Sequence, residues 1–263
     1  MSSRVAQKEA ARKLRMAAEA QSNRRARQRL HRRRLIATLV AAAAVVVVAI
    51  AISSGRSSRL TASPGGRLSG AAFSSGLFAG IPQRGTVLGR ADAPVRLVEF
   101  ADLQCPYCDE YAVQALPSLV ASYVRDGKLQ MQFENLSFIG PDSVKAGRVA
   151  AAAAEQNRLW NFVDLLYLNQ GQENTGYVTA SYLHRLLSAV PALNVSAALR
   201  ASGTPAADAA LHQANQLAAD EGVTGTPTFL VGRTGRAFRV FQPASLTAGA
   251  FESEINALLA GVR

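Results

Sequence analysis

The sequence FADLQCPYC at residues 100–108 joins an apolar run, Val95 to Phe100, to a stretch with helical spacing, Asp109 to Arg125. The apolar run is nearly continuous, which is typical of a central strand that is covered on both faces. Both cysteines of the protein, Cys105 and Cys108, lie at the turn from strand to helix. Because one sulfur can attack there while the other resolves, the spacing predicts a thiol–disulfide exchange site.

The start of a helix favours a reactive sulfur, because the thiolate is the species that reacts. Unpaired backbone N–H groups and the helix dipole are expected to stabilise a negative charge on Cys105. Pro106 suits the first helical turn, where its missing N–H needs no partner. Cys108 lies one turn further in, so we expect it to be less exposed and to attack a mixed disulfide from within the site. The competing interpretation is a pair of unreactive thiols or a static disulfide.

After the motif, the hydrophobic pattern changes between helix and strand character. Pro117 falls inside the first helical pattern and is expected to kink that helix. The elements predicted beyond it are a strand at 129–133, a mainly helical block at 142–221, a hairpin of strands at 228–232 and 237–241, and a closing helix at 248–259.

Two motifs give the sequence a resemblance to the thioredoxin superfamily, and specifically to its DsbA-like branch. Val98 to Cys108 resembles the strand and active-site motif of that branch, and GTPTF at 225–229 resembles its cis-proline loop. The helical block between the motifs is similar to the helical insertion of the branch. The resemblance covers about residues 80–262, and it implies an α/β thioredoxin fold with a helical insertion in a domain at 80–263.

The resemblance also implies a substrate-binding surface made of Pro106, Tyr107, Thr226 and Pro227. A cis bond before Pro227 would turn the backbone of Thr226 toward Cys105, where it could pair with an extended substrate segment. The simpler interpretation is an ordinary trans turn before a strand. Tyr107 departs from the best-known DsbA pattern, which has His there. Because tyrosine supplies no positive charge to the Cys105 thiolate, strong oxidising power is not implied.

Glu99 lies six residues before Cys105 in an otherwise apolar strand. The resemblance implies a buried acid at this position. A buried carboxyl group should have a raised pKa, and it could accept or relay the proton of Cys108. The competing interpretation is an edge acid that reaches solvent.

The N-terminal part of the sequence predicts a membrane anchor. Residues 1–34 carry twelve Lys or Arg and two Glu, and residues 35–52 are eighteen residues without charge. As a helix, residues 35–52 would span roughly 27 Å, which matches a bilayer core. The preceding arginines predict a cytoplasmic N-terminus and an extracytoplasmic C-terminus. A cleaved signal peptide is the competing interpretation. Residues 53–79 are rich in Ser and Gly and predict a flexible linker.

These patterns together predict a single-pass membrane protein that donates disulfides to unfolded or reduced secreted proteins. The resemblance implies reoxidation by a quinone-linked thiol oxidase of the membrane. The part after residue 34 is close to neutral, so its charge favours no nucleic-acid partner. No metal or organic cofactor is expected. The alternatives are an extracytoplasmic disulfide reductase, for example in cytochrome maturation, a membrane-tethered peptide-binding module without catalysis, and a zinc-bridged dimer.

Overall fold

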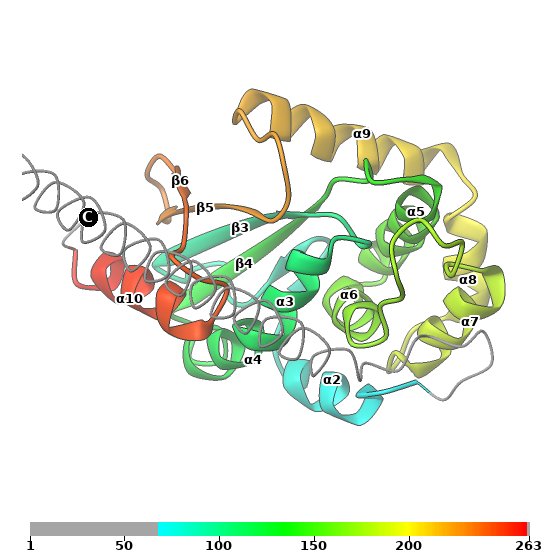
Figure 1. Ribbon diagram of the computed structural model, residues 1–263. Helices are drawn as coiled ribbons and strands as arrows, with labels where there is room; N and C mark the ends of the chain where they lie inside the picture. Colours follow the sequence, from blue (N-terminus) through cyan, green and yellow to red (C-terminus); the bar gives the residue numbers. More distant parts are fainter. Residues whose placement is uncertain (1–67, 262–263) are drawn as a thin grey trace, which may run out of the picture. The chain divides into compact units, whose positions relative to one another are not determined.

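The computed structural model describes residues 68–261 of the chain (Figure 1). The described residues belong to one compact unit. The predicted basic tail, the predicted membrane span at 35–52 and the linker up to residue 67 lie outside the described residues.

Between residues 68 and 261, none of the helices combines the length and the apolar character that crossing a bilayer requires.

The described elements follow in the order α2 (Ala71–Phe78), β1 (Gln83–Arg84), β2 (Val87–Leu88), β3 (Val95–Ala101), α3 (Pro106–Gln114), α4 (Leu116–Leu119), the π-helical turn η1 (Val120–Val124), β4 (Leu129–Asn135), α5 (Pro141–Glu155), α6 (Leu159–Tyr167), α7 (Ala180–Ala189), α8 (Val195–Ala201), α9 (Pro205–Asp220), β5 (Thr228–Arg233), β6 (Arg239–Phe241) and α10 (Ala248–Leu259).

The described strands form one six-stranded sheet in the order β1-β2-β4-β3-β5-β6. β3 lies at its centre, parallel to β4 and antiparallel to β5. Every residue of β3 except Arg96 is buried, because helices cover both faces of the sheet. The apolar run at 95–101 is therefore a central strand, as its composition predicts. Figure 1 shows α9 on one side of β3 and β4, and α4 and α10 on the other.

The helix that follows the motif is interrupted, as Pro117 predicts. α3 ends at Gln114 and α4 begins at Leu116, and Ala115 between them has φ −115° and ψ −48°. Proline lacks an N–H and its ring clashes with the carbonyl four residues earlier, so the chain cannot continue one regular helix through this point. The π-helical turn at 120–124 completes the connection to β4.

The predicted flexible linker extends too far, because residues 71–78 form the helix α2. Ser74 and Phe78 of α2 are buried, and the Phe78 ring lies 6.4 Å from that of Trp160 on α6. Arg125 donates hydrogen bonds to the carbonyls of Leu77 and Ala79 at the C-terminal end of this helix. A Ser- and Gly-rich composition suggested flexibility, but these tertiary contacts stabilise a helix there.

The helices α5 to α9 occupy residues 141–220, the stretch for which the sequence predicts a helical block. β5 and β6 pair as the predicted antiparallel hairpin, and α10 is the predicted closing helix. The helical block connects β4 to β5, so both sequence motifs meet at the same end of the central strands.

Candidate active site

Cys105 and Cys108 lie where β3 gives way to α3. Cys105 is the N-cap residue of α3, with extended backbone at φ −68° and ψ 120°, and Pro106 is the first helical residue. Cys108 is fully buried, Cys105 is 4% exposed, and both thiols are free. The strand-to-helix turn and the deeper position of Cys108 therefore agree with the sequence prediction.

The pKa of Cys105 is lowered from its ordinary value of 9.0 to about 6. The largest cause is a hydrogen bond from the thiol of Cys108, and burial opposes it. Hydrogen bonds from the Thr226 side chain and from the backbone N–H groups of Cys108 and Tyr107 lower the pKa further. Burial raises the pKa of Cys108 well above its ordinary value. At neutral pH, Cys105 is therefore mainly a thiolate and Cys108 a thiol.

The second sequence motif, at 225–229, lies beside the first, because both are at the same end of the paired strands β3 and β5. The Thr226–Pro227 peptide bond is cis, as the resemblance implied. Sγ of Cys105 lies 3.4 Å from the main-chain carbonyl oxygen of Thr226, and in its protonated form the Cys105 thiol donates a hydrogen bond to it. Two segments that are 121 residues apart in the sequence thus form one site.

A groove of about 370 Å³ adjoins the cis-proline loop. Its walls include Tyr107, which is 62% exposed, and Val240, which is 47% exposed. Both are large side chains that stay exposed beside the cis-proline loop. Further lining residues are Pro227, Thr228, Phe229 and Leu246.

Glu99 is buried in the middle of the sheet, so the alternative of an edge acid that reaches solvent is wrong. It lies on β3 in register with Phe133 of β4 and Phe229 of β5. Its Oε1 atom has no hydrogen-bond partner among the described residues. Burial, and secondly the charge of Cys105, raise the pKa of Glu99 to about 8. The site thus contains a carboxyl group that can carry a proton at neutral pH.

Asp102 is a residue of the site that the sequence analysis missed. Its side chain is completely buried and accepts four hydrogen bonds. Oδ1 accepts from the N–H of Gln104 at 2.8 Å and from the hydroxyl of Ser143 at 2.6 Å. Oδ2 accepts from the N–H groups of Phe138 at 2.9 Å and Ile139 at 3.0 Å. Asp102 therefore joins the cysteine turn to the loop after β4 and to the start of α5.

Two glutamines extend this connection. Gln170 donates hydrogen bonds to the carbonyls of Leu103 at 3.1 Å and Cys105 at 3.2 Å. The side chain of Gln104 is buried and accepts a hydrogen bond from the N–H of Asn174 at 2.9 Å. The cysteine turn is thus attached to the helical block through several polar contacts.

A charged residue directly after a buried strand was the available signal for Asp102.

Within residues 68–261, no cluster of three or more His, Cys, Asp or Glu side chains is arranged to hold a metal ion. The two described histidines, His184 and His212, are exposed.

Comparison with known proteins relates the chain to disulfide-forming proteins. Residues 83–239 match the model of the thioredoxin family. Probable disulfide bond formation protein D of Bacillus cereus is 39% identical over 98 residues, which cover 36% of this chain and 45% of that protein. Disulfide bond formation protein D of Bacillus subtilis is 32% identical over 103 residues, which cover 37% of this chain and 45% of that protein. The matches thus span a little under half the length of these curated relatives.

Two solved structures share the fold. The crystal structure of oxidised BdbD from Bacillus subtilis has a TM-score of 0.60 and 21% identity, and the match covers 69% of this chain and 98% of that chain. The α-DsbA1 of Wolbachia pipientis has a TM-score of 0.58 and 17% identity, with 67% of this chain and 91% of that chain covered. The DsbA-like α/β fold that the resemblance implied is thereby confirmed.

Proposed function

Since this chain belongs to the thioredoxin family, we propose that it is a thiol–disulfide oxidoreductase that donates its Cys105–Cys108 disulfide to secreted proteins. The observation that carries this proposal is the pair of sulfurs itself. Cys105 has a pKa of about 6, and Cys108 is fully buried. The names of the Bacillus relatives, which are disulfide bond formation proteins, support the same reaction class.

The reaction begins with the oxidised enzyme. A substrate thiolate attacks Sγ of Cys105, the bond between Cys105 and Cys108 breaks, and Cys108 leaves with the electron pair. A second substrate thiolate then attacks the substrate sulfur of the mixed disulfide, and Cys105 leaves as a thiolate. Two electrons pass from the substrate to the enzyme, and the substrate gains one disulfide. A low Cys105 pKa favours this direction because it stabilises the leaving thiolate and the reduced enzyme.

Glu99 is proposed to exchange a proton with Cys108. The Cys108 thiolate is unfavourable in its buried position, so it takes up a proton when it leaves. The buried carboxyl group of Glu99 retains a proton at neutral pH and can supply it, directly or through water. In the reverse step the same carboxylate accepts the proton of Cys108.

The substrate is proposed to lie along the cis-proline loop. The main chain of Thr226 faces Cys105, and the adjoining groove has Tyr107 and Pro227 in its walls. An extended substrate segment can pair with the Thr226 backbone, and its side chains can occupy the groove. Pro106 begins α3 beside Cys105 and completes this surface.

The proposed location is the outer face of the cell membrane. The support is the sequence alone: a basic segment at 1–34 is followed by an uncharged apolar segment at 35–52. This arrangement would anchor the catalytic domain to the lipid bilayer on the extracytoplasmic side. Reduced enzyme would be reoxidised there by a quinone-linked thiol oxidase of the membrane, and reduced secreted proteins would be the substrates.

The test is a redox titration of the full chain in detergent, combined with refolding of a reduced secreted protein. Disulfide donation predicts a reduction potential nearer to about −120 mV than to about −270 mV, and faster recovery of the refolded substrate. A potential near the lower value, with faster reduction of substrate disulfides, would instead identify an extracytoplasmic reductase. The absence of histidine at position 107 is the feature that favours that second function.

Glu99→Gln is expected to stabilise the reduced protein while slowing its reaction. Because the folded-state pKa of Glu99 is raised from 4.5 to about 8, the wild-type protein loses stability as pH rises between these values. Glutamine removes this loss, so the variant should gain about 1–3 kcal/mol at neutral pH, with no gain below pH 4.5. The step that moves the Cys108 proton should slow on the order of 100-fold.

These effects are measured by denaturant unfolding at several pH values and by stopped-flow reaction with a disulfide-forming peptide. Glu173→Gln, at an exposed position, is the matched control and should change neither quantity. A Glu99→Gln variant that reacts at the wild-type rate would remove Glu99 from the proposed mechanism.

A further inference from the structure

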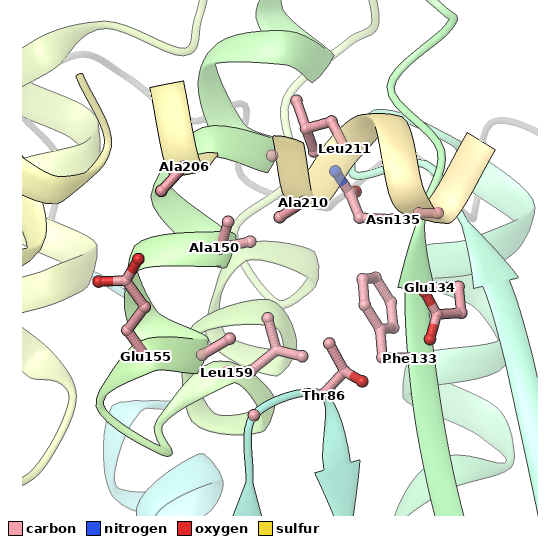
Figure 2. A pocket seen from close by; sticks show the side chains of 15 residues that line it. Thr86, Phe133, Glu134, Asn135, Ala150, Glu155, Leu159, Ala206, Ala210 and Leu211 are labelled. Carbon is pink, nitrogen blue, oxygen red and sulfur yellow. The ribbon is translucent and has the colours of Figure 1, made fainter. Parts of the chain in front are cut away.

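A second hollow of about 260 Å³ lies between β4, α5, α9 and the turn after β1 (Figure 2). It shares no lining residue with the groove beside Cys105. Figure 2 shows Ala206 and Ala210 of α9 above the hollow, Ala150 of α5 on one side and Phe133 of β4 on the other. The hollow opens to solvent, and most of its lining side chains are small or apolar. Its alanine lining comprises Ala150, Ala151, Ala154, Ala206, Ala210 and Ala214.

One edge of the sheet is open at this hollow. The N–H of Leu136 donates to the carbonyl of Ala101, 2.8 Å away, so the backbone polar groups of the preceding Asn135 point away from β3. β2 pairs with β4 only as far as Gln132, and the N–H of Phe133 donates to Thr86. Among the turn and loop hydrogen bonds of residues 68–261, none involves the N–H or the carbonyl of Asn135, and the pairing of β4 with β2 ends at Gln132.

The side chain of Asn135 presents a further unpaired group. Asn135 lines the hollow, is 9% exposed, and its Oδ1 atom has no hydrogen-bond partner in the described part of the chain. Its Nδ2 donates to the hydroxyl of Ser137 at 2.8 Å, which fixes the direction of the amide. A Cβ atom at Gly147 would lie 2.3 Å from Nδ2, so the glycine provides the space for this orientation. A buried acceptor left without a partner is unfavourable, and a ligand N–H would satisfy it.

The free groups match those of a peptide chain. A backbone N–H, a backbone carbonyl and a side-chain acceptor at one strand edge are what an added strand binds. The alanine walls leave room for apolar side chains of modest size. Glu155 lines the hollow at an exposed position, and no Lys or Arg lines it. The carboxyl group of Glu134 accepts a hydrogen bond from Gln132 and lies near Arg96, so it adds little to the charge of the hollow. A positive charge on the ligand would therefore be favoured over a negative one.

We propose that this hollow binds an extended polypeptide segment, with apolar side chains and a Lys or Arg, as an added strand on the edge of β4. The site uses neither cysteine, so the proposal goes beyond the thiol–disulfide reaction. It provides a second place at which the protein can hold an extended polypeptide.

The test is calorimetric titration of the full chain in detergent with the cysteine-free peptide acetyl-Ala-Val-Leu-Lys-amide. Saturable binding is expected, and Ala210→Trp, which fills the hollow, should weaken it at least about tenfold. Ala209→Trp is the matched control, because Ala209 is an exposed neighbour on α9 that does not line the hollow. If Ala210→Trp fails to fold, Ala206→Trp, at an exposed lining position, takes its place.

Two altered peptides test the mode of binding. Methylation of the backbone nitrogens removes the N–H donors of an added strand, and replacing Lys with Glu reverses the ligand charge. Both should weaken binding at least about tenfold. The proposal is overturned if the parent peptide shows no saturable binding, if the filling variant binds it normally, or if either altered peptide binds equally well. Because the peptides have no thiol, none of these outcomes affects the proposed redox function, which the reduction potential tests separately.

Discussion

Replacing Cys105 with Ser is expected to abolish thiol–disulfide exchange completely, because the hydroxyl oxygen cannot form a disulfide with Cys108 or with a substrate. Cys105 is the sulfur that faces the Thr226 carbonyl, and its pKa of about 6 makes it the thiolate of the pair. Cys108 is fully buried and its pKa is well above the ordinary value, so it cannot take over the first attack. Refolding of a reduced secreted protein should proceed no faster than in buffer alone.

Cys108→Ala is the informative partner of this variant. When it is mixed with a substrate that carries a disulfide, the Cys105 thiolate attacks one sulfur of that disulfide and the other leaves as a thiolate. Without Cys108 the enzyme has no second sulfur to release the substrate, so covalent enzyme–substrate adducts should accumulate on non-reducing gels. Because a hydrogen bond from Cys108 is the largest cause of the lowered Cys105 pKa, that pKa should rise from about 6 toward 9. Alkylation rates measured against pH follow this shift directly. Substantial exchange by the Cys105→Ser variant would show that the wrong sulfur has been assigned. If the protein is instead a non-catalytic peptide-binding module, peptide binding should be the same in both variants and in the wild-type protein.

Asp102→Ala is expected to cause the largest loss of stability of the changes considered, about 3–5 kcal/mol in the free energy of unfolding. The substitution leaves four donors without their buried acceptor: the N–H groups of Gln104, Phe138 and Ile139 and the hydroxyl of Ser143. Denaturant unfolding measures the loss. Because Asp102 also positions the cysteine turn, the Cys105 pKa should move from about 6 toward its ordinary value in variant protein that is still folded.

Two matched variants distinguish the loss of the Asp102 hydrogen bonds from a nonspecific effect of removing a carboxylate. In Asp102→Asn, the amide nitrogen must face at least one backbone N–H, so an intermediate loss of stability is expected. Asp126→Ala removes an exposed carboxylate that pairs with Lys128, and no measurable change is expected. If Asp102→Ala unfolds like the wild-type protein, the carboxylate does not hold the turn. If stability falls but the Cys105 pKa stays near 6, Asp102 stabilises the fold without positioning the reactive sulfur.

Much of the fold follows from local patterns. The apolar run at 95–101 predicts a central strand because only a strand covered on both faces can bury nearly all its side chains. Pro117 predicts the interruption between α3 and α4 because proline cannot donate to the helix. The helix α2 was missed, since a sequence with two Ser and one Gly has low helical preference. Tertiary contacts stabilise it, among them packing of Phe78 against α6 and hydrogen bonds from Arg125.

In the candidate active site too, local features were predicted from the sequence and features that depend on distant segments were not. Cys105, Pro106 and Cys108 are neighbours in the chain, so their arrangement at a helix start is a local property. Asp102 was not predicted, because its hydrogen-bond donors come from distant segments. The open edge of β4 at Asn135 was not predicted either, because it depends on which distant segments fail to pair with that strand. No sequence pattern shows that a strand edge is left unpaired.

By itself, the sequence determined the central strand, the turn into the helix and the pair of sulfurs, because covalent spacing and side-chain periodicity act over a few residues. The tertiary structure decided the burial that raises the pKa values of Cys108 and Glu99, whereas the hydrogen bond from Cys108 that most lowers the Cys105 pKa is local. Burial of Glu99, the approach of Thr226 to Cys105 and the four donors around Asp102 arise only when the sheet and the helical block pack together. Solvent exclusion and hydrogen bonds between distant segments shift pKa values, and both are properties of the packed chain.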